Sequence, residues 1–189
     1  MKRDCCLNET HEESSVDVAE AFTIDPVNAP KPEDDPHHAC RHCGGASRPV
    51  SRKTVLLMLK PEMFDRVGEN EYHFCSDSDC RVVYFTENSG VTFIIDDLRV
   101  RVGLKERIYP ISLCYCFGFD ESDAREEIKR MGQSTIPHRI AALIKQGMCA
   151  CPSRNPSGAC CLGEVNRAVK RLTSEIVESA GADLTMIEA

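Results

Sequence analysis

All twelve cysteines of this 189-residue chain lie in close pairs. Two of these pairs, in the segments CRHCGG and CSDSDC, form a first set: Cys40, Cys43, Cys75 and Cys80. Four thiolates on two turn-like segments are the donor set of a tetrahedral zinc site, which closes a small fold through four bonds to sulfur. The second pair is spaced more widely than CxxC, so a neighbouring side chain could replace one cysteine: His42, His73, Asp77 or Asp79.

A second set places six thiols within 48 residues: Cys114, Cys116, Cys149, Cys151, Cys160 and Cys161. Packing alone does not require so many, so they predict a second thiolate metal centre. Nearby helix N-termini would supply positive partial charge, which suits an anionic iron–sulfur cluster, although zinc would also be chemically acceptable. The remaining pair, Cys5 and Cys6, offers ligands for a soft ion such as Cu⁺, but the favoured interpretation gives it no specific role.

Charge separates the amino-terminal segment from the rest. Residues 1–39 carry ten acidic and three basic side chains, whereas residues 40–189 carry twenty of each. With four prolines and few large apolar residues, the segment 1–38 is predicted to be a disordered acidic tail. The neutral remainder has no basic stripe, which argues against a nucleic-acid partner. No apolar run approaches the roughly 18–20 residues of a membrane span, and no leader is readable, so we expect no membrane insertion and a cytoplasmic location. In that reducing compartment cysteines favour metal ligation over disulfides.

The elements that must position the cysteines change type along the chain. Apolar and β-branched runs predict strands at 54–60, 81–86, 91–96 and 99–105, with a hairpin at ENSG (87–90). Helical spacing and capping residues then predict helices at 120–131, 135–146 and about 164–180. We therefore predict an α+β fold with a β-rich zinc-binding subdomain over 39–112, a helical subdomain over 113–181 and a C-terminal tail over 182–189.

The motifs of the second set resemble a known domain. The segment CYCFGFDESDAREEIKRMG, then a second helix and a loop ending CCLGEV, resembles the bacterioferritin-associated ferredoxin (BFD-like) [2Fe–2S] domain. Over about residues 40–172, the order of motifs is similar to the zinc and [2Fe–2S] amino-terminal domain of long-form CopZ copper chaperones. The resemblance implies a small antiparallel zinc-ribbon-like subdomain followed by a helical BFD-like one.

By position, the resemblance implies cluster ligands at Cys114, Cys116, Cys151 and Cys161. Spacing also permits Cys149 in place of Cys151. Cys161 is favoured over Cys160 because Val165 then follows the last ligand by four residues, as in BFD-like domains.

The resemblance implies a non-enzymatic protein of copper or heavy-metal handling that holds Zn²⁺ and a [2Fe–2S] cluster and transfers single electrons, for example to reduce Cu²⁺ to Cu⁺. Its partner would be a redox protein or a copper chaperone or transporter. The GMxCxxC copper loop of long-form CopZ proteins does not occur in this sequence, so we expect a separate chaperone to carry copper. The alternative is a thiol-rich module that sequesters or relays soft metals without redox activity. A zinc-ribbon interaction domain is disfavoured by the neutral charge, and no catalytic triad or phosphate loop indicates a conventional enzyme.

Overall fold

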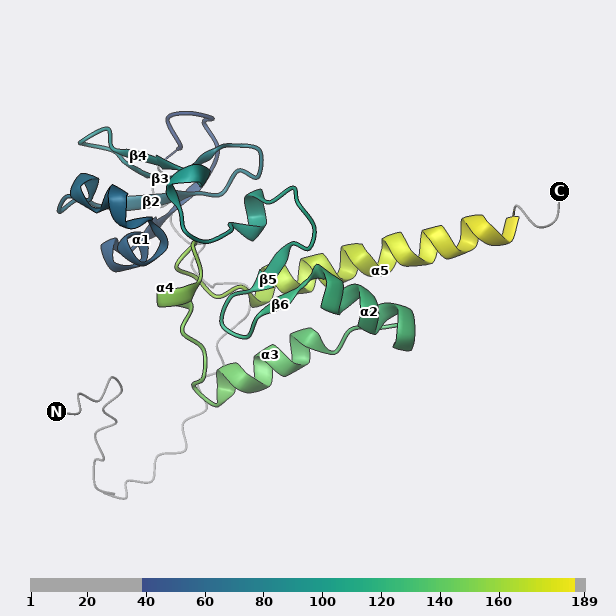
Figure 1. Ribbon diagram of the computed structural model, residues 1–189. Helices are drawn as coiled ribbons and strands as arrows, with labels where there is room; N and C mark the ends of the chain where they lie inside the picture. The colour runs from purple at the N-terminus through teal and green to yellow at the C-terminus, as the bar shows by residue number, and fades with distance from the viewer. Residues whose placement is uncertain (1–38, 186–189) are drawn as a thin grey trace, which may run out of the picture. The chain divides into compact units, whose positions relative to one another are not determined.

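The computed structural model describes residues 39–185 (Figure 1). The predictions for the tail 1–38, including Cys5 and Cys6, and for residues 186–189 lie outside this part of the chain. The described chain combines a small antiparallel sheet with a group of helices, so the α+β prediction is confirmed. Among the described residues, no helix has both the length and the hydrophobicity needed to cross a bilayer.

Four antiparallel strands make up the sheet, in spatial order β1-β2-β3-β4. They are β1 (Ser47–Val50), β2 (Tyr72–Cys75), β3 (Val82–Thr86) and β4 (Thr92–Ile94). Every residue of the central strands β2 and β3 is buried, so these strands form the middle of the core. The predicted hairpin at 87–90 is confirmed, because β3 pairs with β4 across it and Gly90 takes the left-handed conformation with φ +68°.

Two of the four predicted strands are wrong. Residues 54–60 lie mostly in the helix α1 (Arg52–Met58), which begins where the Ser51 hydroxyl accepts the Thr54 N–H at 3.1 Å. The buried residues of α1 are Thr54, Val55 and Met58, a helical spacing that a short apolar run does not distinguish from a strand. Their burial against the sheet, together with this N-cap, decides the helix.

The segment 99–105 also forms no strand. It bends and ends in the 3₁₀ turn η3 (Gly103–Lys105), with Val102 buried and Leu104 exposed. Its backbone follows α1 instead of a strand, since the Arg99 N–H donates to Met58 O at 2.9 Å. Conversely, β1 and β2 were not predicted. Two further 3₁₀ turns, η1 (Pro61–Arg66) and η2 (Ile95–Asp97), connect these elements.

The helical half confirms the predicted helices closely. It contains β5 (Ser112–Cys114), β6 (Phe119–Asp120), α2 (Glu121–Met131), α3 (Ile136–Lys145), α4 (Cys151–Arg154) and α5 (Leu162–Thr185). Helix α2 starts at the N-cap Asp120 and ends at Gly132, in agreement with the predicted range 120–131. Helix α5 begins before and ends after the predicted range 164–180, and so continues into the segment expected to be a C-terminal tail (182–189).

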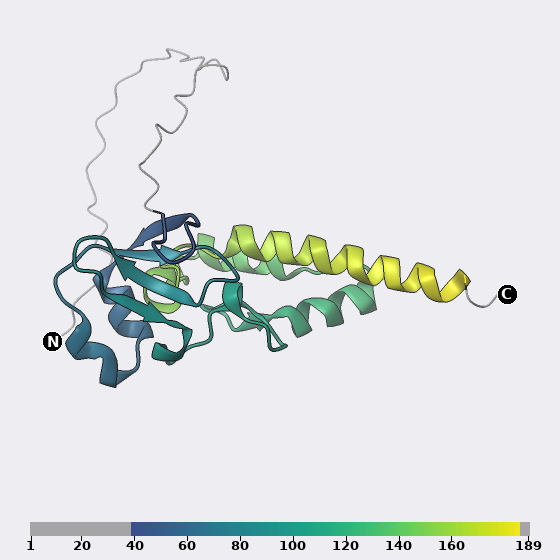
Figure 2. The same ribbon diagram turned by 90° about the horizontal axis from the view of Figure 1, so that it is seen from above.

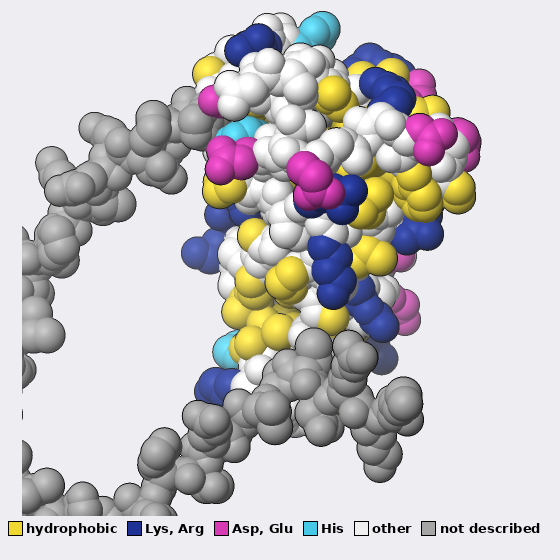
Figure 3. All heavy atoms as spheres, turned by 90° about the vertical axis from the view of Figure 1, so that its left-hand side faces the viewer, with side chains coloured by type: hydrophobic (Ala, Val, Ile, Leu, Met, Phe, Trp, Pro, Cys, Tyr) yellow, Lys and Arg dark blue, Asp and Glu magenta, His cyan; other side chains and the backbone are white. Residues whose placement is uncertain are grey.

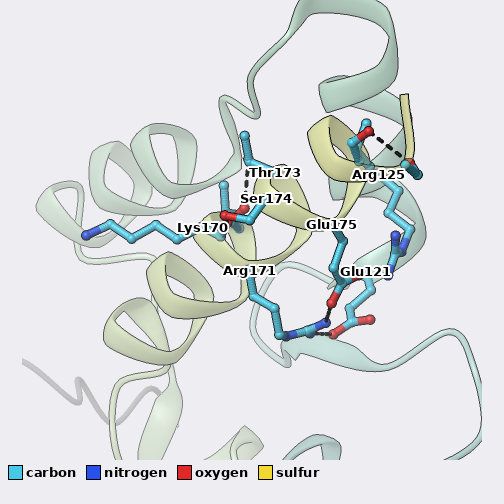
Figure 4. Close-up of polar contacts among 10 residues, drawn as sticks. Glu121, Arg125, Lys170, Arg171, Thr173, Ser174 and Glu175 are labelled. Atoms are coloured by element: carbon cyan, nitrogen blue, oxygen red, sulfur yellow. Dashed lines mark hydrogen bonds and ion pairs between the residues drawn. The ribbon is translucent and has the colours of Figure 1, made fainter. Parts of the chain in front are cut away.

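Helices α2 and α3 pack beside the first part of α5 (Figures 1 and 2). One face of α5 is an apolar stripe, because Val165 and Leu172 are fully buried while Val169 and Ile176 pack against the same core. Ion pairs fasten α2 to α5 at the edge of this core (Figure 4): the buried Glu121 pairs with Arg171, which also binds Glu175 at 2.7 Å. Glu175 in turn accepts from Arg125 at 2.5 Å.

Two hydrogen bonds join the sheet half to the cysteine-rich loop before α5. The Thr54 hydroxyl of α1 donates to Pro152 O at 2.6 Å, and the buried Tyr84 hydroxyl of β3 donates to Pro156 O at 2.7 Å. Both contacts connect residues far apart in the sequence. On the face shown in Figure 3, acidic, basic and hydrophobic side chains lie side by side.

Replacement of Tyr84 tests the connection between the halves. We expect Tyr84→Phe to lower the free energy of unfolding by about 1–3 kcal/mol, because it leaves the buried carbonyl of Pro156 without its donor. Urea unfolding of the metal-loaded protein, followed by circular dichroism, measures the change. The exposed Tyr109 provides the matched control as Tyr109→Phe, and equal stability of the two variants would contradict the role of Tyr84.

Candidate metal centres

The first cysteine set converges at one end of the sheet. The sulfur atoms of Cys40, Cys43, Cys75 and Cys80 all lie within 4.8 Å of one another. The Sγ atoms of Cys43 and Cys75 are 3.7 Å apart, which matches the sulfur–sulfur separation of roughly 3.8 Å that a tetrahedron with bonds of about 2.3 Å requires. These four thiols therefore have the spacing of ligands around a single ion.

None of the alternative ligands belongs to this group. Asp77 shapes the turn between Cys75 and Cys80 instead, since its carboxylate accepts the N–H groups of Asp79 at 2.8 Å and of Cys80 at 3.2 Å. The structure therefore favours the all-cysteine set over the substitutions that the wide spacing left open.

Strand pairing and a tight turn bring the two cysteine pairs together. The register of β1 and β2 sets Ser47 opposite Cys75, which carries the segment containing Cys40 and Cys43 to the end of β2. Gly44 takes φ +70°, and the next amide, that of Gly45, donates to the Cys43 sulfur at 3.3 Å. Amides aimed at sulfur are expected where a thiolate must be stabilised.

A buried lysine that sequence reasoning missed lies beside this centre. Lys105 of η3 is 5% exposed, and its ammonium donates to Asp77 O at 2.5 Å and to Cys80 O at 3.1 Å. Burial raises the pKa of the Cys75 thiol, while backbone hydrogen bonding and the Lys105 charge oppose that rise. A lysine is almost never buried without partners, so these contacts mark a specific arrangement.

The second cysteine set forms two separate pairs. The Sγ atoms of Cys116 and Cys151 are 3.7 Å apart, and Cys161 is the neighbour that most strongly lowers the pKa of the Cys114 thiol. Among the described residues, only the first set forms a group of three or more such ligand atoms within 4.8 Å of one another. The second set is therefore two pairs of sulfurs and not one tight quartet.

This arrangement bears on the alternatives that spacing left open. Of the sequence neighbours Cys149/Cys151 and Cys160/Cys161, the structure brings Cys151 and Cys161 to the CYC segment (residues 114–116). Both of these thiols are buried. Cys160 is exposed and Cys149 is half-buried. These last two thiols lie at the margin of the centre.

Local hydrogen bonds determine the shape of each loop of this centre. The Cys114–Gly118 turn joins β5 to β6, closed by the Gly118 N–H donating to Cys114 O at 2.9 Å. The NPSG loop is held by the buried Asn155, whose side chain donates to Ala159 O at 2.7 Å and accepts the Ser157 N–H at 3.0 Å. Asn155 is a positioning residue that sequence reasoning missed, although the turn-forming NPSG sequence was a signal for it.

Hydrogen bonding makes the paired thiols unequal. The Cys161 thiol donates to Cys114 and lowers the pKa of Cys114 to about 6, against the effect of burial. The pKa of Cys161 changes in the opposite direction, because the same hydrogen bond and burial both raise it. In the other pair, burial and the neighbouring Cys116 raise the pKa of Cys151 to about 12, while the Ala150 N–H donates to the Cys116 sulfur at 3.3 Å. A cation bound between such thiols would deprotonate them fully.

Comparison with known proteins agrees with the geometry of the first centre. Residues 37–99 match the CopZ-type family described as a zinc binding domain. The chain is 31% identical over 128 residues to a copper chaperone CopZ from Archaeoglobus fulgidus, covering 68% of this chain and 60% of that protein. The X-ray structure of the Archaeoglobus fulgidus CopZ N-terminal domain superposes with a TM-score of 0.56 at 30% identity, covering 68% of this chain and 95% of that domain.

Disulfide trapping tests the pairing in the second set. We expect protein prepared with one equivalent of Zn²⁺ and no iron, then treated with oxidised glutathione, to form Cys116–Cys151 and Cys114–Cys161 disulfides. The sulfurs need to close only from 3.7 Å to about 2.0 Å in the first of these pairs. Mass spectrometry of peptides identifies the bonds, and iodoacetamide should label Cys149 and Cys160. Disulfides between either of these two and the CYC segment would contradict the observed pairing.

Proposed function

The chain belongs to the family of CopZ amino-terminal domains, and from this membership we propose that it is a metal-handling module with a structural zinc and an electron-transferring [2Fe–2S] cluster. The family match and the four-sulfur group support zinc binding by a CopZ-like cysteine cluster. The chain spans 60% of the length of the Archaeoglobus fulgidus copper chaperone, so its role in copper handling is part of the proposal.

Zinc fits the first centre by chemistry and by size. We assign Cys40, Cys43, Cys75 and Cys80 as its ligands, since four thiolates at tetrahedral spacing are a common structural zinc site. Zn²⁺ has no redox chemistry, so its part here is to cross-link β1, β2 and the turn before β3. A sheet of this size has a small core, and such a cross-link is a common source of stability in small domains.

The two-pair arrangement of the second centre carries the proposal. In a [2Fe–2S] cluster each iron takes two cysteine sulfurs, so the four ligands come as two close pairs separated by the bridging sulfides. The approach of Cys116 to Cys151 and the interaction of Cys114 with its neighbour Cys161 support an assignment of these residues as the two pairs. A single tetrahedral zinc would need all four sulfurs equally close, as the first set has them.

The surroundings of these pairs suit an anionic centre near the surface. The Ala150 N–H donates to the Cys116 sulfur, and α5 begins directly after Cys161, so its positive N-terminal end lies nearby. Cys114 and Cys161 are 1% and 2% exposed, whereas Cys116 is half-buried. When bound, the cluster would supply a one-electron carrier. The chain's outer pair, Cys116 and Cys151, would provide the shorter route for an electron to a docked partner.

Copper is the substrate that this assignment favours. The relative with 31% identity is a copper chaperone, and thiolate proteins carry copper as the soft monovalent ion. One electron delivered at the surface converts Cu²⁺ into Cu⁺, with a reductase as its source. The proposed partners are therefore a redox protein and a copper chaperone or transporter.

Metal analysis of anaerobically purified protein tests the proposal. We expect a reddish-brown protein with about two irons, about two sulfides and about one zinc per chain, bleached by dithionite. The absorption spectrum and elemental analysis provide the measurement. A colourless protein with two zincs would reject electron transfer and favour the sequestering module instead.

Single cysteine replacements test the assignment of ligands. Cys116→Ser should abolish the visible absorption while the purified protein keeps its zinc, because it removes one sulfur of the outer pair. Cys43→Ser should release zinc and reduce the stability of the sheet half. The control Cys149→Ser should keep both metals, since Cys149 lies outside the pairs. Loss of colour in that control would overturn the choice of Cys151.

A further inference from the structure

The turn η3 touches both metal centres, although it carries no ligand of either. At one end, Lys105 donates to two backbone carbonyls of the turn between Cys75 and Cys80. At the other end, the Gly103 N–H donates to the hydroxyl of Tyr115 at 2.6 Å. Tyr115 lies between Cys114 and Cys116 in the CYC segment. Three consecutive residues thus span the distance between the two sets of sulfurs.

Lys105 is suited to hold a thiolate zinc centre. Four thiolates and one Zn²⁺ carry a net charge of about −2, which is costly to bury without a compensating cation. The Lys105 ammonium is buried, fixed by the carbonyls of Asp77 and Cys80, and lies 5.7 Å from the centre of the Phe74 ring. Both its charge and its hydrogen bonds therefore favour the zinc-bound shape of that turn.

Gly103 fixes the other end of η3 against the CYC segment. A Cβ atom at this position would lie 2.1 Å from the backbone oxygen of Ser112, the first residue of β5. Only glycine allows this approach, so η3 and β5 are in direct backbone contact. The hydrogen bond to Tyr115 then extends the contact to the residue that separates two of the proposed cluster ligands.

The space beside this contact is open. Gly103 and Tyr115 both line a cavity of about 460 Å³, with Phe74 of the sheet on one side and Glu164 of α5 on another. The hydrogen bond between Tyr115 and η3 borders this cavity, as does Pro156, which accepts from Tyr84.

We infer that η3 couples the two centres, with Lys105 and Tyr115 as positioning residues, so that zinc at the first centre favours the cluster-binding arrangement of the CYC segment. This inference rests on the proposed function for its iron–sulfur half. Coupling of two binding sites is reciprocal, so the arrangement of the CYC segment must also affect zinc binding. Removal of the Tyr115 hydroxyl, which accepts from η3, is therefore expected to weaken zinc binding. If Tyr115 served only to pack the helical half, its replacement would leave the zinc affinity unchanged.

Competition with a chromogenic zinc chelator tests the reciprocal effect. We expect Tyr115→Phe, which removes only the hydroxyl, to weaken zinc binding about fivefold, the size of one lost buried hydrogen bond. The control Tyr109→Phe alters an exposed tyrosine of the neighbouring loop and should leave the zinc affinity at the wild-type value. Wild-type zinc affinity in Tyr115→Phe would overturn the inference.

A double-variant cycle identifies η3 as the route. Lys105→Met keeps the length of the side chain but removes its charge and its donors, and should weaken zinc binding about tenfold and accelerate loss of visible absorption under EDTA about fivefold. In the Lys105→Met background, Tyr115→Phe should produce no further loss of zinc affinity, whereas additive effects would show two independent routes and reject the inference. If Lys105→Met does not fold, the Tyr115→Phe measurement decides alone.

The two proposals fail in different ways. A colourless wild-type protein rejects the electron-transfer function, yet the zinc measurements still decide the coupling. If the wild-type protein is coloured but Tyr115→Phe has wild-type zinc affinity, the proposed function stands and the coupling is rejected.

Discussion

Repulsion between closely spaced thiolates is the constraint on which this structure depends. Four sulfurs of the first set lie within 4.8 Å of one another, and Cys116 and Cys151 approach to 3.7 Å across 35 positions of sequence. Ionised thiols at such distances repel one another strongly unless a cation lies between them. Neutral thiols attract one another too weakly to bring distant segments together. The arrangement of strands and loops around the sulfurs is therefore that of a metal-binding protein.

The two centres use the same residue type for different geometries. In the sheet half, antiparallel pairing and two turns produce one compact quartet. In the helical half, the CYC segment contributes one sulfur to each of two pairs, and the second sulfur comes from the start of α4 or from the residue before α5. A quartet suits an ion without redox chemistry, and two pairs suit a two-iron centre, so the proposed division of labour follows from sulfur spacing.

Polar contacts connect the sheet half and the helical half, so the protein is not simply two adjacent small domains. Tyr84 and Thr54 bind the loop that leads into α5, while Lys105 and Gly103 bind the zinc turn and the CYC segment from opposite ends of η3. Each of these side chains or amides is buried or half-buried, so its hydrogen bond is not replaced easily by water. Such contacts allow the occupancy of one centre to affect the other.

The sequence by itself determined the residues that could bind metal, the change from sheet to helices, and the limits of α2 and α3, because cysteine spacing, caps and helical periodicity are local signals. It did not determine whether residues 54–60 form a strand or a helix, since burial against the sheet and the Ser51 cap decide between them. It favoured Cys161 over Cys160 only through the resemblance, and it neither separated Cys151 from Cys149 nor identified Lys105 and Asn155. Those assignments depend on which loops meet in space, and only the packing of α5 and the sheet around them fixes that meeting.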